Sequence, residues 1–300
     1  MALPTHVKPM LATSAKLPTA GEWAYEIKWD GVRALAFIEG GSLRLESRNL
    51  LDITARYPEL GALPAAVGAR EVLLDGEVVA FDEHGKPSFS ALQRRMHVGD
   101  PHAVRGHVAA TPVLFAIFDV LIVDGESLME RPWTERRAIL EELVEAGDRW
   151  RVPSVHADGA ALAEATRAQG LEGIVAKRTR SLYVPGRRSP DWVKVKNIRR
   201  QEMVIGGWLP GTGRREGTIG ALIVGVYQGD DLLFSGKVGT GFTDAELDRL
   251  SGILAPLART SSPFAEKVPY KQARYVEPAL VAEVEFTEWT PDANLRHPSY

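Results

Sequence analysis

The sequence predicts an α+β domain over residues 1–198, followed by a small β-barrel domain over residues 199–300. Three observations lead to this fold class. The length of 300 residues exceeds one ordinary domain and fits two. The first two hundred residues mix strand-like and helix-like patterns, whereas residues 203–238 are short β-rich pieces separated by glycine turns. This change in composition places the boundary near residues 197–201.

The strands of the first domain are predicted from their apolar patterns, at residues 33–38, 43–47, 71–81, 113–123, 173–177 and 192–196. The first two form a hairpin across Gly40-Gly41. The third contains Asp75-Gly76, which predicts a break in the strand. The fourth is a nearly continuous apolar run, typical of a strand buried on both faces.

Helices are predicted from amphipathic patterns at residues 89–96, 134–146, 160–169 and 244–257. Thr134 is expected to cap the second of these helices. Thr243 and Glu246 form a capping-box pair at the start of the fourth. A last strand, residues 281–287, is expected to close the barrel.

Composition excludes several classes of protein. The chain contains no cysteine, which excludes disulfides and cysteine-ligated zinc. It shows no apolar segment of the signal-peptide type, and no apolar run reaches the ~20 residues that span a membrane. The histidines lack metal-ligand spacing, and His97, His102 and His107 are expected on a surface loop. We therefore expect a cytoplasmic protein with no membrane partner.

Charge is unevenly distributed along the chain. Residues 177–200 contain nine basic residues and one acid, so they carry +8, while the rest of the chain carries −11. Within this segment Val193 and Val195 alternate with Lys194 and Lys196, as in a half-buried strand that directs both lysines at one target. The pattern predicts an anion-binding surface, and a solvated basic face is the alternative.

Residues 26–33, EIKWDGVR, place Lys28 two positions before the pair Asp30-Gly31. A hairpin with a surface lysine explains this stretch, because Asp-Gly is a common turn signal. A reactive lysine held beside a turn explains it equally well. The octapeptide alone leaves both interpretations open.

Six short motifs, taken together and in order, resemble the nucleotidyltransferase motifs of ATP-dependent DNA ligases, and most closely those of bacterial end-joining ligases. A lone Lys-x-Asp-Gly is weak, but the ordered set is specific. The resemblance runs from KPMLA at residues 8–12 to LRHP at residues 295–298. The motifs are Lys28-Trp-Asp30-Gly31-Val-Arg33, Ser47-Arg48-Asn49, Asp75-Gly76-Glu77, Phe118-Asp119, Glu172-Gly-Ile-Val-Ala-Lys177 and Lys194-Val-Lys196.

The resemblance implies a nucleotidyltransferase (adenylation) domain over residues 1–198 and an OB-fold domain over residues 199–300. It implies that Lys28 attacks the α-phosphorus of ATP and forms a lysyl-AMP phosphoramidate. Only a neutral amine attacks, so Lys28 must lose its proton. The ATP-binding residues that it implies are Glu26, Lys28, Arg33, Arg48, Glu77, Phe118, Lys194 and Lys196.

The resemblance also implies separate roles for these side chains. Phe118 stacks on adenine, although a packed core aromatic is the alternative. Glu77 accepts from a ribose hydroxyl, while Arg33 and Arg48 donate to ribose or phosphate oxygens. The two lysines of residues 194–196 hold the α-phosphate as charge develops there.

A divalent metal, magnesium or manganese, is the second cofactor that the resemblance implies. Glu172 matches the metal-associated carboxylate, with Asp30 as a weaker candidate. A surface acid and a turn residue are the respective alternatives. Glu26 is expected near the adenine amine. Trp29 and Trp192 are expected to pack rather than to contact ligand.

The implied function is the sealing of nicked or broken double-stranded DNA through lysyl-AMP and a DNA-adenylate. The expected partners are DNA, a Ku-like end-binding protein and a polymerase domain or subunit, around a monomer associated with the nucleoid. An RNA ligase or another lysyl-nucleotidyltransferase is one alternative. A non-catalytic nucleic-acid-binding module is another.

The C-terminus departs from the pattern of these ligases. Arg296 matches the start of their last motif, but the distal arginine and lysine are absent, because the sequence ends at Ser299-Tyr300. In the ligases those groups orient pyrophosphate during lysine adenylation. We therefore expect the OB-fold domain to be truncated at its C-terminus.

Overall fold

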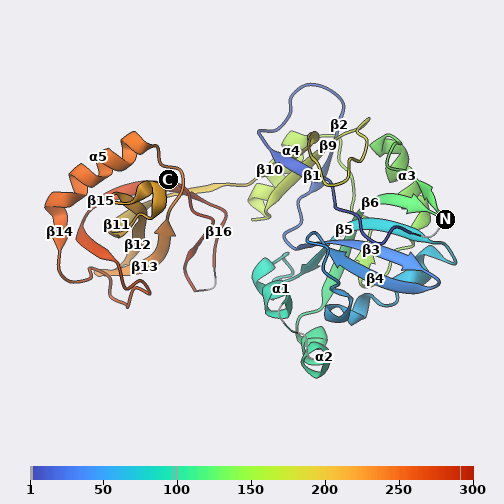
Figure 1. The fold of residues 1–300 in the computed structure, drawn as a ribbon, viewed down its shortest axis with the longest axis horizontal. Helices are drawn as coiled ribbons and strands as arrows, with labels where there is room; N and C mark the ends of the chain where they lie inside the picture. Colours follow the sequence, from blue (N-terminus) through green and yellow to red (C-terminus); the bar gives the residue numbers. More distant parts are fainter. Residues whose placement is uncertain (1–2, 97, 99–100, 291) are drawn as a thin grey trace. The chain divides into compact units, whose positions relative to one another are not determined.

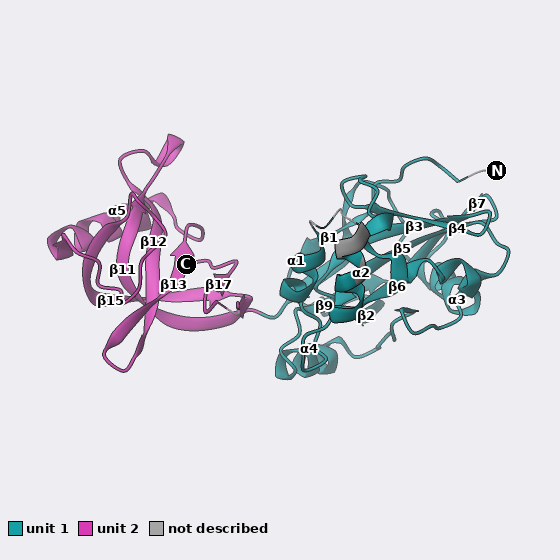
Figure 2. Cartoon of the chain, turned by 90° about the horizontal axis from the view of Figure 1, so that it is seen from below, with its two compact units in different colours: residues 1–197 teal, residues 198–300 magenta. Residues whose placement is uncertain are grey.

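The computed structural model describes residues 3–300 apart from residues 97, 99, 100 and 291. The chain forms two compact units, residues 1–197 (unit 1) and residues 198–300 (unit 2), coloured separately in Figure 2. No helix in the described part of the chain is long and apolar enough to cross a membrane.

Unit 1 is built around two β-sheets (Figure 1). The larger sheet has the order β4-β3-β5-β6-β7, with β8 paired to β6. Its strands are β3 (Val32–Glu39), β4 (Ser42–Ser47), β5 (Val72–Ala80), β6 (Val113–Val123), β7 (Glu126–Ser127) and β8 (Trp150–Arg151). The smaller sheet has the order β1-β10-β9-β2, with β1 (Leu11–Ser14), β2 (Trp23–Ile27), β9 (Gly173–Arg178) and β10 (Arg188–Lys196).

The larger sheet is buried on both faces. One face packs on a core that includes Leu74, Phe115 and Leu140. The other face contributes Leu35 and Phe118 to a second core that also contains Met10, Ala24, Tyr183 and Trp192 from the segments of the smaller sheet. The continuous burial of β6 from Val113 to Ile122 confirms the expectation of a strand buried on both faces.

Among its described residues, unit 1 has four α-helices beside these sheets: α1 (Phe89–Met96), α2 (Pro101–Ala110), α3 (Trp133–Leu143) and α4 (Gly159–Ala168). Helix α4 covers the outer face of the smaller sheet, where Leu162 packs with Tyr25 and Ile174. Its first turn is capped by Asp158, whose Oδ1 accepts from the amides of Ala160 and Ala161, each at 3.0 Å.

The connection between β2 and β3 is the first departure from a simple reading of the sequence. These strands are consecutive along the chain but belong to different sheets, so residues 28–31 cross between sheets and do not form a hairpin. Gly31 explains the crossing, because a Cβ atom there would lie 2.2 Å from the carbonyl oxygen of Val78. The glycine allows the crossing chain to lie directly against β5.

Three further expectations for unit 1 are wrong. Strand β5 continues through Asp75-Gly76, where only its register with β6 shifts. Helix α3 begins at Trp133 after Pro132, so Thr134 is not its cap. Residues 101–110 form helix α2 where a loop was expected around His102 and His107, since proline fits the first position of a helix. His97 lies outside the described residues.

Unit 2 is a β-sheet domain of the OB-fold class, with sheet order β13-β12-β11-β15-β14. Val224, Leu250 and Val284 form part of its core, which helix α5 covers. Thr243 caps α5, because its Oγ1 accepts from the Glu246 amide at 3.2 Å. The elements are β11 (Arg199–Pro210), β12 (Ile219–Gln228), β13 (Asp231–Val238), α5 (Asp244–Leu254), β14 (Ala258–Arg259), β15 (Arg274–Phe286), β16 (Glu288–Trp289) and β17 (Leu295–Arg296).

Strand β15 begins at Arg274, seven residues earlier than the strand expected at residues 281–287. Pro278 concealed this start, because proline usually argues against a strand interior. In the structure the proline lies where the β11–β15 register jumps, between the pairs Ile205–Leu280 and Gly207–Tyr275. The strand therefore accommodates it at an irregularity.

Candidate active site

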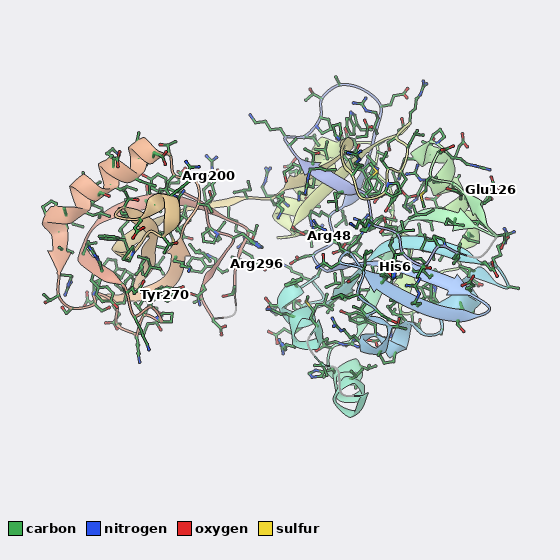
Figure 3. All side chains as sticks on the ribbon, viewed as in Figure 1. His6, Arg48, Glu126, Arg200, Tyr270 and Arg296 are labelled. Atoms are coloured by element: carbon green, nitrogen blue, oxygen red, sulfur yellow. The ribbon has the colours of Figure 1, made fainter. Side chains whose placement is uncertain are left out.

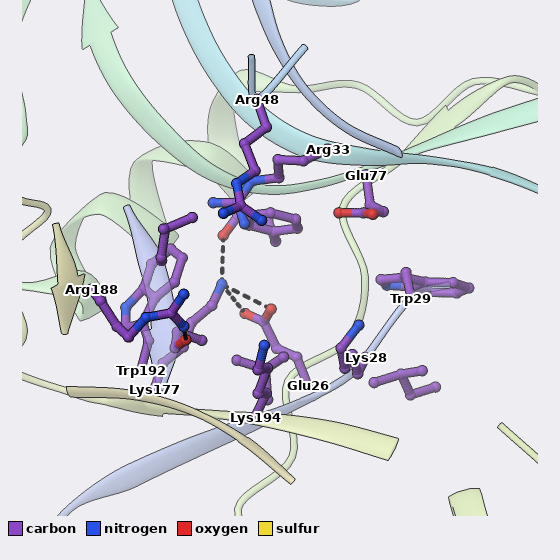
Figure 4. Close-up of a pocket in the computed structure, with 15 residues that line it drawn as sticks. Glu26, Lys28, Trp29, Arg33, Arg48, Glu77, Lys177, Arg188, Trp192 and Lys194 are labelled. Atoms are coloured by element: carbon purple, nitrogen blue, oxygen red, sulfur yellow. Dashed lines mark hydrogen bonds and ion pairs between the residues drawn. The ribbon is translucent and has the colours of Figure 1, made fainter. Parts of the chain in front are cut away.

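One cavity of unit 1 collects side chains from both sheets and from the N-terminal segment (Figure 4). Because β2 passes into β3 at this point, residues close in sequence reach it from both sheets. Seven of the eight side chains expected at an ATP site line the cavity: Glu26, Lys28, Arg33, Arg48, Glu77, Phe118 and Lys194.

Lys28 is held at the start of the crossing segment. Its backbone amide donates to the carbonyl of Gly173 at 2.9 Å. Its Nζ donates to Glu172, and the other oxygen of the same carboxylate lies 3.3 Å from Nζ of Lys196. A single carboxylate therefore bridges two lysine amines, one from the crossing segment and one from β10. Lys196, the eighth expected residue, joins the site through this bridge rather than by lining the cavity.

Arg33 is fixed beneath the cavity by a buried carboxylate. Its Nε and Nη2 donate to the two oxygens of Asp75 at 2.5 and 2.6 Å. Its guanidinium carbon lies 4.6 Å from the centre of the Phe118 ring. Burial acts to lower the pKa of Arg33, but the adjacent Asp75 outweighs it and the pKa is raised. Arg33 is therefore a permanent cation here.

Glu26 and Lys177 form a buried pair at the closed end of the cavity. Nζ of Lys177 donates to Oε1 of Glu26 at 3.0 Å, a contact drawn in Figure 4. It also donates to the carbonyl oxygen of Phe118 at 3.2 Å. Burial lowers the pKa of Lys177, against the opposing effect of Glu26. The ammonium also lies 4.5 Å from the ring centres of both Phe118 and Trp192.

Glu77 faces the same cavity from β5. Burial raises its pKa to about 7, although Lys28 and Arg33 act to lower it. A carboxyl group with this pKa changes charge near neutral pH. Glu77 can therefore accept a hydrogen bond as a carboxylate or donate one as an acid.

Cations concentrate at the open end of the cavity. Lys194 lies there, and burial followed by Lys196 and Lys28 lowers its pKa. Arg188 lines the same wall and donates to the carbonyl of Ala12 at 2.6 Å. Arg48 reaches in from the turn after β4. A group of positive charges around one cavity can hold the negative oxygens of a polyphosphate.

The sequence interpretation missed several lining residues. Lys177 belongs to one of the motifs but was not among the expected ATP-binding residues, although Val175 and Lys177, two positions apart on β9, both line the cavity. That period of two is the signal that was available. Trp29 and Trp192 also line the cavity rather than only packing. Arg188 gave no signal, because it was one arginine among several in a basic run.

The metal candidates fare differently. Glu172 lies beside Lys28, as described above. Asp30 is in the crossing segment and is not among the residues that line the cavity. Among the described residues there is no group of three or more histidine, aspartate or glutamate side chains placed to hold a metal ion.

Ion pairs within the chain neutralise part of the basic segment 177–200, so the predicted anion-binding surface depends on the cations that are left. Five of its nine cations form ion pairs with acids: Lys177 with Glu26, Arg178 with Asp191, Arg180 with Glu22, Lys196 with Glu172, and Arg200 with Glu283 and Glu285. Arg200, labelled in Figure 3, belongs to unit 2. Lys194 and Arg188 point into the cavity instead.

Comparisons with known proteins identify the family to which the chain belongs. Residues 9–196 match the family model "ATP dependent DNA ligase domain", and residues 215–300 match "ATP dependent DNA ligase C terminal region". The chain is 42% identical over 300 residues to the multifunctional non-homologous end joining DNA repair protein LigD of Mycobacterium tuberculosis, which covers 98% of this chain and 38% of that protein. It is 39% identical to the LigD protein of Pseudomonas aeruginosa, covering 98% and 35%.

A DNA ligase of Hyperthermus butylicus is 34% identical, with 95% of this chain and 50% of that protein covered. The chain thus spans half or less of these relatives. Among solved structures, the ligase domain of LigD from M. tuberculosis is 40% identical, covers 99% of this chain and 94% of that chain, and gives a TM-score of 0.59. A mycobacterial DNA ligase D complexed with ATP and MES gives the same values.

Proposed function

Because this chain belongs to the ATP-dependent DNA ligases, we propose that unit 1 transfers AMP from ATP to Nζ of Lys28 and then passes it to DNA. The observation that carries the proposal is the position of this amine. It lies in a cavity lined with cations, beside a carboxylate, and at the crossing between two sheets. A side chain that only served solubility would not need such surroundings.

In the proposed first step the neutral amine of Lys28 attacks the α-phosphorus of ATP. A nitrogen–phosphorus bond forms, the bond from the α-phosphorus to the bridging oxygen breaks, and pyrophosphate leaves with the electron pair. The amine loses its protons to solvent or to a nearby acceptor. Lys194, Lys196 and Arg188 would stabilise the negative charge that develops on the phosphate oxygens.

The closed end of the cavity would bind the nucleoside. Phe118 offers a ring face, and the buried pair Glu26–Lys177 offers an acceptor and a donor to the base edge. Glu77 and Arg33 would contact the ribose, and Arg48 would contact ribose or phosphate. These groups orient the α-phosphorus for attack.

A divalent metal, magnesium or manganese, fits the donor set through Glu172. Carboxylate oxygen is a ligand that such cations prefer, and magnesium is commonly held by one or two carboxylates together with substrate phosphates. When bound, the metal supplies charge neutralisation at the phosphates.

The later steps follow from the same chemistry. AMP would pass from Lys28 to the 5′-phosphate of nicked or broken double-stranded DNA, and the 3′-hydroxyl would then displace AMP. Unit 2 would help to bind the duplex. A role in end joining is supported by the names of the LigD relatives, whereas a Ku-like partner and a polymerase domain or subunit stay predictions. A monomeric state and association with the nucleoid stay predictions.

Labelling with [α-³²P]ATP tests the proposal. The purified protein should become covalently labelled in the presence of magnesium or manganese and should then seal a nicked duplex. Lys28→Ala should reduce labelling by at least about 10³-fold. Lys16→Ala, at an exposed lysine, is the matched control and should not. Labelling of the Lys28→Ala protein, preference for GTP, or sealing of RNA in place of DNA would contradict it.

A further inference from the structure

Tyr183 lies outside all the sequence motifs, in the segment between β9 and β10. Its side chain is buried in the core between the two sheets of unit 1. Its backbone amide donates to the carbonyl of Met129 at 2.9 Å, and its ring packs edge-on against Trp192, 5.7 Å between centroids. The phenol is therefore held from both its backbone and its ring.

The hydroxyl of Tyr183 lies between two fixed groups. The Met10 amide donates to Oη of Tyr183 at 3.0 Å, and Oη lies 2.7 Å from Oδ2 of Asp75. An amide can only donate, and a carboxylate can only accept. The phenolic proton must therefore point at Asp75. Burial, followed by Asp75, raises the pKa of Tyr183 well above its usual value, so the proton stays in place.

This hydrogen bond continues to the cavity. Asp75 is fully buried, and both of its oxygens receive Arg33, Oδ1 from Nε and Oδ2 from Nη2. Nη1 of Arg33 has no hydrogen-bond partner among the described residues, and Arg33 lines the cavity. Nη1 is thus the part of the guanidinium that is left for a ligand.

The chain of contacts joins segments that are far apart in the sequence. Tyr183 is 108 residues from Asp75 and 173 residues from Met10, and Asp75 is 42 residues from Arg33. Tyr183 and Met10 flank strands of the smaller sheet, whereas Asp75 and Arg33 belong to the larger one. The Tyr183 hydroxyl therefore connects the segments of the smaller sheet to the larger sheet through the carboxylate of Asp75.

We propose that Tyr183 is a positioning residue for ATP, whose hydroxyl orients Asp75 so that Nη1 of Arg33 faces the bound nucleotide. The inference rests on the proposed function of the cavity. It assigns Tyr183 no contact with substrate, because its effect passes through Asp75. A contact that Arg33 makes equally before and during the reaction lowers KM without changing kcat.

Tyr183→Phe tests the proposal, because it removes one oxygen atom and keeps the ring. Lysyl-AMP formation is measured in the full chain over a range of ATP concentrations. We expect KM for ATP to rise about tenfold and kcat to stay within about twofold. A purely structural role would lower the urea midpoint and leave KM for the folded enzyme unchanged, and that result would overturn the proposal.

Two further variants sharpen the result. Tyr57→Phe is the matched control, because Tyr57 is also buried and its hydroxyl has no hydrogen-bond partner in the described part of the chain. It should change neither KM nor kcat. In an Arg33→Ala background, Tyr183→Phe should add nothing to the rise in KM, because its effect requires Arg33. An additive rise would contradict the proposal.

If Tyr183→Phe does not fold, Asp75→Asn carries the same test. The amide keeps the size of the side chain but removes the charge that holds Arg33, so KM should rise and kcat should change little. An unchanged KM in Asp75→Asn would overturn the inference. Failure of the proposed function looks different, because the wild-type protein itself would then form no lysyl-AMP.

Discussion

Two groups of ion pairs in unit 1 use the same residue types and do different things. Arg136 and Asp119 are both fully buried, with Nε and Nη2 of Arg136 at 2.8 and 2.9 Å from the two oxygens of Asp119. Nη1 donates to the carbonyls of Arg131 and Ser181. Every nitrogen of this guanidinium is used within the chain. We call this pair closed, because it leaves no guanidinium donor for a ligand.

The ion pairs at the cavity are open. Lys28 and Glu172 keep 21% and 14% of their side chains exposed, and Lys196 shares the same carboxylate. Arg33 keeps Nη1 for a ligand. The difference teaches that a charged motif alone does not identify a site. A binding site is identified by hydrogen-bond donors that are left unused beside a cavity. Asp119 belongs to a motif, yet its carboxylate pairs with Arg136 and stabilises the fold instead.

The largest expected effect is on the closed pair. Arg136→Met leaves Asp119 buried without its cationic partner and with only the Val120 amide, 3.0 Å from Oδ1, as a donor among the described residues. It should lower the free energy of unfolding by about 3–5 kcal/mol. The double variant Arg136→Met/Asp119→Leu should recover most of this loss. Lys28→Ala should cost less than about 1 kcal/mol, because Glu172 keeps Lys196. Urea unfolding of the three variants measures the difference between the two sites. Equal losses of unfolding free energy in Arg136→Met and Lys28→Ala would contradict the distinction between closed and open pairs.

The next effect is catalytic. Glu172→Gln should slow lysyl-AMP formation by about 10²-fold and raise the metal concentration needed for half the maximal rate, because the amide holds a cation poorly. Glu142→Gln, on the exposed face of α3, should change neither quantity. Single-turnover labelling across a magnesium titration gives both numbers. A Glu172→Gln protein with an unchanged metal requirement would contradict the role of this carboxylate.

A smaller effect concerns pH and Glu77, whose pKa burial raises to about 7. The folded state then binds a proton that the unfolded state releases between about pH 4.5 and 7. Its contribution to stability is fully present below about pH 4.5 and is lost as the pH rises to about 7, by about 3 kcal/mol. The difference in unfolding free energy between wild type and Glu77→Gln should follow this trend from pH 4.5 to 8.

The same titration should affect ATP. In the proposed site the Glu77 carboxylate would accept from a ribose hydroxyl, and its protonated form would accept less well, so KM for ATP should fall by up to about tenfold between pH 6 and 8. Glu77→Gln should remove this component of the pH profile. A profile that is identical in the two proteins would show that Glu77 does not contact the nucleotide.

The smallest effect is in the turn that carries Arg48. Leu50 has φ of +62°, a conformation that costs a non-glycine residue about 1–2 kcal/mol. Leu50→Gly should relieve this strain and, after the entropy cost of glycine, raise the unfolding free energy by about 0.5 kcal/mol. Leu51→Gly, at an exposed leucine, should lower it by a similar amount. Loss of stability in Leu50→Gly would show that its side-chain packing outweighs the strain.

Much of the fold was predictable because its signals are local. Apolar patterns predict strands β3, β6 and β10, and the capping residue Thr243 predicts the start of helix α5. The crossing between β2 and β3 was not predictable, because residues 28–31 resemble a hairpin turn. The choice depends on the contact between Gly31 and Val78, which are distant in sequence.

The site divides in the same way. The ordered motifs predicted that Lys28, Glu77 and Lys194 belong to one site, and the structure places all three around one cavity. Tyr183 and Arg188 could not be found, because their roles depend on partners in other segments. Residues that belong to a motif or to a periodic pattern can be predicted from the sequence. A buried hydrogen bond between two sheets cannot, because it leaves no pattern in the sequence.

The internal pairing of the basic segment 177–200 has a consequence for how DNA binding should respond to ionic strength. Each phosphate that a cation neutralises releases counterions, and the slope of log K against log salt is about −0.9 for each phosphate on duplex DNA. Nine cations acting on phosphates would give a slope of about −8. Four cations of the segment lack an acidic partner among the described residues, and two of them, Lys194 and Arg188, face the cavity. The share of the segment in the slope should therefore be nearer −2, so DNA binding through it should depend much less on salt than binding through nine free cations would.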